Sequence, residues 1–171
     1  CDIEINEQNA EAIWRECNAS IAAQNLTPRK LIEKSNVKYL FTTNEVFDDL
    51  NVFAEIAEKG YGFKVFPAFR ADKIMNIEAE KYNEFVSLLE QKTESIRTLS
   101  DLETALECRL KAFIKAGSKA SDIALESVEL IPDRRVAEKI FAERRNGNVP
   151  TADNVKAFKG YLTYFLMKLY A

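Results

Sequence analysis

Apolar residues recur every three to four positions near the start of the chain, which is typical of a helix with one apolar face. The side chains on this face are Ile13, Trp14, Cys17 and Ile21, and Asn6 stands where an N-cap is needed. No base accompanies Cys17, so we interpret it as a small buried apolar residue. The pattern predicts a helix that packs through one stripe.

Three short runs have a different character, because β-branched and aromatic residues follow one another without a helical period. These runs are residues 37–42, 63–67 and 120–125. Pro67 has no N–H group to donate to a neighbouring strand, so we expect regular pairing to fail there. Residues 68–72 are then expected to form a loop that leaves the second strand.

Helical stretches separate and follow these strands, and residues typical of helix ends mark their limits. Ser100 and Glu103 match a capping box, in which each side chain accepts a hydrogen bond from the backbone N–H of the other residue. The helix that follows carries an apolar stripe of Leu102, Leu106, Leu110 and Phe113. Further N-caps are expected at Thr27, Asp133 and Thr151, and helix ends at Gly60, Gly117 and Gly147.

The last helix is apolar on nearly all sides from Tyr161 onward, which predicts burial on most sides. The chain nevertheless stops at Ala171 without a polar tail, and it starts at Cys1 without an initiator Met. We therefore expect the chain to be a piece of a longer protein.

Strands separated by helices imply right-handed crossover connections and a parallel sheet, so the expected fold class is α/β. The elements divide into an N-terminal helical part over residues 1–36, a strand-and-helix part over residues 37–126 and C-terminal helices over residues 127–171. Three strands cannot close a barrel, so both sheet edges need cover. Helices or a second copy of the chain, in a homo-oligomer, are expected to supply it.

Charge and composition narrow the function. Lys+Arg number 24 and Asp+Glu 27, for a net charge of −3, and the signs are interspersed. This argues against a nucleic-acid partner or an electrostatic membrane anchor, and no apolar stretch reaches transmembrane length. The three cysteines are far apart and odd in number, which indicates a reducing, cytoplasmic location.

The chain contains no histidine, so it has no imidazole base and no imidazole metal ligand. A zinc site built from cysteine alone usually needs four thiolates, and only three cysteines are present. We therefore expect this segment to bind no cofactor or metal and to contribute no catalytic residue of these classes.

In parallel α/β folds the functional site forms at the carboxyl ends of the strands. Asn44, Arg70, Asp72 and Asp122 follow or end the predicted strands, and we take them as candidate substrate-binding residues. The forked donors of Arg70 match a carboxylate or a phosphate, although an ion pair with Asp72 or Asp122 is the simpler alternative. Asp122 is either a base or, more simply, a hydrogen-bonding cap of its loop, and Lys73 is expected to be solvated.

Several stretches resemble the uronate isomerases, in one order along nearly the whole chain. Residues 63–78, FKVFPAFRADKIMNIE, resemble that family's K-V-L-P-x-F-R-P-D-K-x-x-N-I segment. Residues 117–126 resemble G-C-R-x-S-D-H-G-L, and residues 11–18, 31–43 and 158–171 also resemble the family.

The resemblance implies a metal-assisted isomerase of the amidohydrolase superfamily on a (β/α)8 TIM barrel, of which this chain would hold strands two to four. Such enzymes interconvert glucuronate with fructuronate, and galacturonate with tagaturonate. They bind a divalent metal, zinc or manganese, through an H-x-H and an Asp that lie outside the present chain. Arg70 matches the arginine of F-R-P-D, and the resemblance implies that it contacts the substrate carboxylate.

The sequence departs from the family at three places. Asn44-Glu45-Val46 stands for D-D-P, Ala71 replaces a proline, and Ile123 replaces the histidine of S-D-H-G. Any role of that histidine is therefore lost here. The isolated chain, which has no histidine and lacks the regions that bind the metal, is expected to be inactive. Two hypotheses remain open: a segment of an active uronate isomerase, or a catalytically dead binding or structural module derived from the same scaffold.

Overall fold

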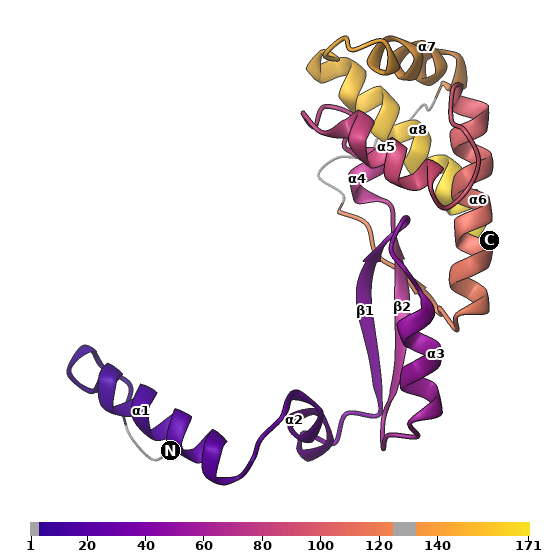
Figure 1. The fold of residues 1–171 in the computed structure, drawn as a ribbon. Helices are drawn as coiled ribbons and strands as arrows, with labels where there is room; N and C mark the ends of the chain where they lie inside the picture. Colours follow the sequence, from indigo (N-terminus) through magenta and orange to yellow (C-terminus); the bar gives the residue numbers. More distant parts are fainter. Residues whose placement is uncertain (1–3, 125–132) are drawn as a thin grey trace. The chain divides into compact units, whose positions relative to one another are not determined.

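The computed structural model describes residues 4–124 and 133–171, and these fall into two compact units. The first unit comprises residues 4–40 and 60–64, and the second comprises residues 41–59 and 65–171. The described elements (Figure 1) are η1 Glu7–Asn9, α1 Ala10–Ala23, α2 Pro28–Lys34, β1 Tyr39–Glu45, α3 Asn51–Glu58, β2 Lys64–Arg70, α4 Asp72–Met75, α5 Tyr82–Glu90, α6 Leu99–Lys115, β3 Ala120–Ser121, α7 Arg134–Arg145 and α8 Ala152–Tyr170.

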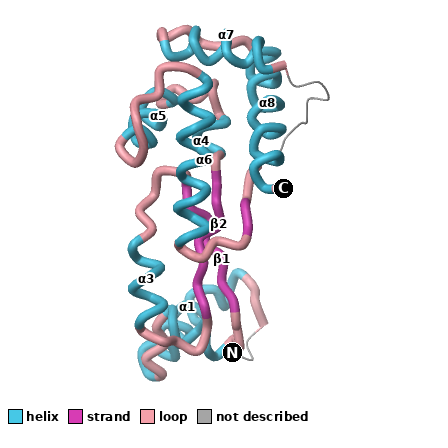
Figure 2. The backbone as a smooth tube through the Cα atoms, turned by 90° about the vertical axis from the view of Figure 1, so that its right-hand side faces the viewer, coloured by secondary structure: helices cyan, strands magenta, loops and turns pink. Residues whose placement is uncertain are grey.

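The three strands form one parallel sheet in the order β1-β2-β3. In the pairing of β2 with β3, Ala68 lies opposite Ala120 and Phe69 lies opposite Ser121. Helices connect the strands, as the tube in Figure 2 shows, so the α/β prediction with parallel strands is confirmed. All three strands therefore end at the same edge of the sheet.

The second strand continues past Pro67 as far as Arg70, so the expected loop over residues 68–72 is wrong. The ladder with β3 begins opposite Ala68, one residue after Pro67. The missing N–H of Pro67 therefore removes no bond from this ladder. The consequence is that Arg70 ends a strand instead of lying in a loop.

The third strand is shorter than expected, because it ends at Ser121. Beyond it the backbone N–H of Ala124 donates to Oδ1 of Asp72 at 2.9 Å, so a side chain takes the place of a neighbouring strand. Leu125, the last residue of the predicted strand, lies outside the described residues. The predicted domain boundaries at residues 36 and 126 stay predictions, since the second also falls there.

The core of the second unit lies between the sheet and its helices. The predicted stripe of α6 is confirmed, since Leu102, Leu106 and Phe113 are completely buried and Leu110 packs against them. The ring of Phe69 meets the ring of Phe113 edge to face, with centroids 5.1 Å apart. Burial of these aromatic and aliphatic side chains fixes α6 on the sheet.

Three of the predicted N-caps are confirmed: Thr27, Asp133 and Thr151 each accept a backbone N–H from the first turn. The capping box, however, consists of Thr98 and Asp101 rather than Ser100 and Glu103. Oδ2 of Asp101 accepts from the backbone N–H of Thr98 at 2.8 Å. Glu103 instead binds Arg134 of α7, so a tertiary contact determines which of two matching patterns is used.

One expected burial is wrong, and another is met only in part. Helix α1 buries none of its residues, and the side chain of Trp14 is 67% exposed, while Cys17 is half-buried. Besides α1, the described part of the first unit holds only the one-turn helix η1 and the seven-residue α2 as helices, which is too little to cover this stripe. Helix α8 packs against α7 and α4 and buries Tyr161, Leu162, Thr163 and Leu166, so it is buried on several sides there, while Tyr164 and Met167 remain 47% and 53% exposed.

Candidate functional site

Arg70 is the centre of a charged cluster at the carboxyl ends of β2 and β3. Its Nη2 lies 3.2 Å from Oδ2 of Asp122, which follows β3 directly. Its Nε lies 2.9 Å from Oδ2 of Asp72, the first residue of α4. The ion pairs that the sequence left open as the simpler alternative are thus both present, and three of the four candidate residues come together.

The arginine of this cluster keeps unused hydrogen-bonding capacity. Its Nε is buried, and its contact with Asp72 at 2.9 Å is an ion pair rather than a hydrogen bond. The side chain as a whole is 31% exposed. A guanidinium has five N–H donors, so one with partial access to solvent is able to receive a further acceptor.

The two carboxylates of the cluster have different tasks. Asp72 is 15% exposed, and its Oδ1 accepts from the backbone of Ala124 at 2.9 Å. Asp122 is 41% exposed. Asp72, rather than Asp122, therefore caps the loop after β3, and Asp122 is the partner that Arg70 exchanges more easily.

Asn44 lies at the same edge of the sheet but is held separately from Arg70. Its Oδ1 accepts from Oγ1 of Thr42 at 2.7 Å, and its Nδ2 donates to Oδ2 of Asp48 at 3.3 Å. The structure therefore places all four candidates at the carboxyl ends of the strands.

Glu45 and Lys73 join this edge through a contact between β1 and α4. Oε2 of Glu45 accepts the backbone N–H of Lys73 at 3.4 Å, and burial raises the pKa of this carboxyl above its usual value. The ammonium of Lys73 lies 5.4 Å from the ring centroids of Phe47 and of Phe85. The expectation that Lys73 is solvated is wrong, because cation–π contacts hold it over these rings.

Sequence reasoning missed Arg109, which is only 9% exposed in α6. Its Nε donates to the carbonyl of Val46 at 2.5 Å and its Nη2 to the carbonyl of Asp48 at 2.8 Å. Desolvation by burial lowers the pKa of this guanidinium. One signal was available: Arg109 lies three residues after Leu106 and four before Phe113, so it falls on the apolar stripe.

Ile123 stands where the resembling family has a histidine, and it packs against the hydrophobic core. Within residues 4–124 and 133–171, no three Asp, Glu or Cys side chains come together as metal ligands. The donors that the structure describes do not fit a metal site.

No described helix is long and apolar enough to cross a membrane.

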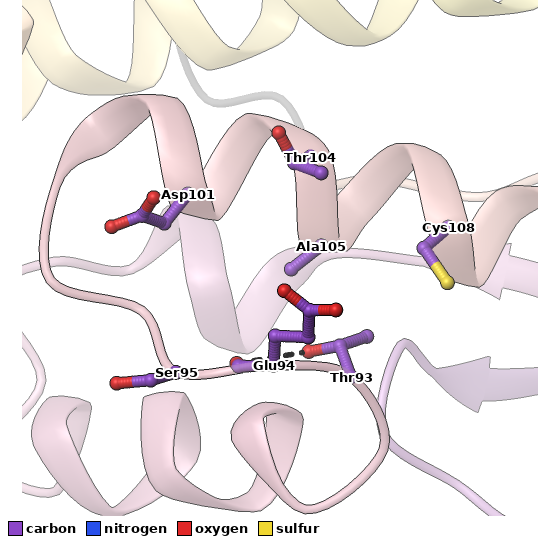
Figure 3. Close-up of a pocket in the computed structure, with 7 residues that line it drawn as sticks. All are labelled: Thr93, Glu94, Ser95, Asp101, Thr104, Ala105 and Cys108. Carbon is purple, nitrogen blue, oxygen red and sulfur yellow. Dashed lines mark hydrogen bonds between the residues drawn. The ribbon is translucent and has the colours of Figure 1, made fainter.

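A separate cavity of about 190 Å³ lies between α6 and the loop that precedes it. Figure 3 shows Thr93 and Glu94 of the loop facing Cys108 of the helix. The described residues that line this cavity include none of the four candidates. Cys108 is exposed, and nothing around it indicates a ligand.

The chain resembles known proteins over nearly its whole length. The family model for glucuronate isomerase matches residues 2–171. The uronate isomerase of Caldanaerobacter subterraneus subsp. tengcongensis is 35% identical over 170 residues, which make up 98% of this chain and 36% of that protein. The chain thus spans about a third of the length of this relative.

Solved structures agree with this comparison. The uronate isomerase from Thermotoga maritima superposes with a TM-score of 0.85 at 27% identity, over 98% of this chain and 37% of that one. The glucuronate isomerase from Caulobacter crescentus gives a TM-score of 0.82 at 24% identity, over 97% of this chain and 35% of that one, and this second likeness concerns the fold.

Proposed function

Because this chain belongs to the glucuronate isomerase family, we propose that it is an internal segment of a uronate isomerase and that Arg70 anchors the substrate carboxylate. The reaction would be an aldose–ketose isomerisation between glucuronate and fructuronate, or between galacturonate and tagaturonate. The segment would contribute three parallel strands to a (β/α)8 barrel of the amidohydrolase superfamily. Its task within that barrel is substrate binding.

The place of Arg70 at the end of β2, with its side chain 31% exposed beside Asp72 and Asp122, is the observation that carries this proposal. A carboxylate suits a guanidinium because two oxygens meet two parallel N–H groups. The more exposed Asp122 is the partner that a carboxylate would displace.

The remaining candidates fit the rest of a uronate. Its chain carries hydroxyl groups, and the carboxylates of Asp72 and Asp122 are hydrogen-bond acceptors for such donors. The amide of Asn44 is both a donor and an acceptor at the same edge of the sheet. We therefore assign Arg70 to the carboxylate and Asn44, Asp72 and Asp122 to the hydroxyl groups.

The chemistry itself would use groups beyond this segment. Isomerisation moves a proton between C2 and C1 of the sugar, and a positioned carboxylate end fixes where those carbons lie. The described donors do not fit a metal. We therefore place any divalent metal of the intact protein on residues outside this segment.

Binding of glucuronate to this chain, measured by isothermal titration calorimetry, tests the anchor directly. Glucose is the control ligand because it lacks the carboxylate. Arg70→Met should abolish the preference for glucuronate over glucose. Arg134→Met, which removes an exposed arginine of α7 that pairs with Glu103 of α6, should retain it. Equal binding of both sugars by the unmodified chain would contradict the assignment.

Turnover by the full-length protein that contains this segment tests the activity. Formation of a ketose from glucuronate is expected, and binding without turnover would instead favour a catalytically dead module.

We also propose a cytoplasmic location, which the scarcity of cysteine supports. A second copy of the chain covering an open sheet edge is a further proposal, and sedimentation of the full-length protein would test it.

A further inference from the structure

Arg109 connects α6 to the loop that follows β1. Both carbonyls that it binds, those of Val46 and Asp48, belong to this loop, and the side chain of Val46 is completely buried. Hydrogen bonds from a charged donor are stronger than neutral ones, and no other residue type offers the same fork. The guanidinium therefore fixes the course of the backbone directly after the first strand.

Asp48 connects the loop that Arg109 holds to the candidate site. Its Oδ2 accepts the backbone N–H of Glu45 at 3.0 Å and the side-chain amide of Asn44 at 3.3 Å. The carbonyl of the same residue is bound by Arg109 at 2.8 Å. One residue thus joins the buried arginine to the end of β1.

A second path leads from Arg109 to the end of β2. The guanidinium carbon lies 5.7 Å from the ring centroid of Phe113, and that ring meets Phe69 edge to face at 5.1 Å. Phe69 is completely buried and directly precedes Arg70. Packed aromatic rings of this kind resist small shifts, because interiors have few voids.

We infer that Arg109 is a positioning residue, which holds the ends of β1 and β2 in the arrangement that Asn44 and Arg70 need to bind the substrate. This inference rests on the proposed function. Arg109 itself does not touch the substrate, and it acts through Asp48 on one side and through Phe113 on the other. Misplacing a binding group by about 1 Å costs up to about 100-fold in rate, so a backbone clamp far from the substrate affects binding.

Arg144 of α7 provides a matched control. It is 6% exposed, its Nε donates to the carbonyl of Ile77 at 2.9 Å and its Nη2 to that of Ala79 at 2.7 Å. Its guanidinium also lies over an aromatic ring, that of Tyr82, at 5.8 Å. Arg144 therefore makes the same kinds of contact as Arg109, but to the loop after α4 instead of the loop after β1.

The experiment compares Arg109→Met, Arg109→Lys and Arg144→Met in the full-length protein that contains this segment. Arg109→Met should raise KM for glucuronate about 10- to 100-fold, with a smaller change in kcat, because binding geometry is lost. Arg109→Lys should raise it less, since an ammonium still donates to one carbonyl. Arg144→Met should lower the unfolding midpoint as Arg109→Met does and leave KM unchanged.

Hydrogen–deuterium exchange on the present chain gives a readout independent of activity. The amide of Glu45, which donates to Asp48, should exchange faster in Arg109→Met and at the original rate in Arg144→Met. Equal effects of the two methionine variants on KM, or an unchanged exchange rate at Glu45, would overturn the inference.

Two further outcomes are also decisive. If Arg109→Met does not fold, Arg109→Lys decides: a raised KM at an unchanged unfolding midpoint supports positioning, and an unchanged KM rejects it. If the unmodified full-length protein does not turn over uronates, the proposed function fails. The exchange rates then still show whether Arg109 holds the loop.

Discussion

Arg70, the last residue of β2, forms an ion pair of 3.2 Å with Asp122, the residue directly after β3. The pair bridges the carboxyl ends of two neighbouring parallel strands. Asp122 is 41% exposed, and pairs of this exposure contribute about 1 kcal/mol or less. The fold therefore places Arg70 at the strand ends, and its ion pair with Asp122 is weak enough for a substrate carboxylate to replace it.

Arg70→Lys should weaken substrate binding even though it keeps the charge. A lysine ammonium cannot copy two parallel N–H donors, so we expect KM for glucuronate in the full-length protein to rise about 10-fold or more. Steady-state kinetics measure the effect. Arg134→Lys is the control, because Arg134 makes a two-pronged contact with Glu103 and none of the contacts that the structure gives it involves a candidate residue. An unchanged KM in Arg70→Lys would reject the carboxylate anchor.

The two aspartates of the cluster should differ in their effect on stability. Asp72→Ala removes a partly buried ion pair together with a hydrogen bond to the exposed backbone N–H of Ala124, so it should cost about 1–2 kcal/mol. Asp122→Ala removes one half-exposed ion pair and should cost less than about 1 kcal/mol. Urea unfolding of the present chain measures both, and the reverse order would contradict the loop-capping role of Asp72.

Local signals predicted much of this fold. Thr27, Asp133 and Thr151 cap helices where the sequence indicated, because a cap involves only residues within one helical turn. Predictions were wrong where contacts between residues far apart in the sequence determine the local structure. Glu103 matched a capping box but binds Arg134, 31 positions away, and Lys73 lies over rings from two other segments.

The residues of the candidate site were also predicted only in part. The rule that strand ends carry the functional groups brought Arg70, Asp72 and Asp122 together correctly. It could not reveal Arg109, because an arginine inside a helix is usually a surface residue. Its carbonyl partners lie 61 and 63 positions away, so only the folded chain shows that it is buried.

Thr98→Ala should destabilise the chain by about 1 kcal/mol, because the N-terminus of α6 loses its cap. Ser100→Ala should have almost no effect, although the sequence pattern alone pointed to Ser100. Urea unfolding compares the two variants under identical conditions. A larger loss in Ser100→Ala would show that the helix begins two residues later in solution.

The isolated chain should not isomerise uronates. It contains no histidine, and its described carboxylates and thiols form no group of three that suits zinc or manganese. Positioning by Arg70 cannot replace the groups that move the proton. An assay of the purified chain with glucuronate and either metal tests this, and turnover that survives removal of host isomerase would contradict it.

Tyr161 of α8 should make stability fall at alkaline pH. Its hydroxyl donates to Oε1 of Glu103, and burial, together with this carboxylate, raises the pKa of the phenol to about 12. In the unfolded chain the phenol loses its proton near its ordinary pKa of about 10. Between these two values the unfolded state binds fewer protons than the folded state, so stability decreases as pH rises.

Tyr161→Phe removes this contribution, so the free energy of unfolding of the variant should depend less on pH across the same window. At pH values below about 10 the unmodified chain should be the more stable of the two, since the phenol is neutral in both states and only the folded state has the bond to Glu103. Above that pH the difference should shrink. Urea unfolding at increasing pH, with phenolate absorbance recorded in parallel, measures both trends, and a difference that stays constant would show that Tyr161 titrates alike in the folded and unfolded chain.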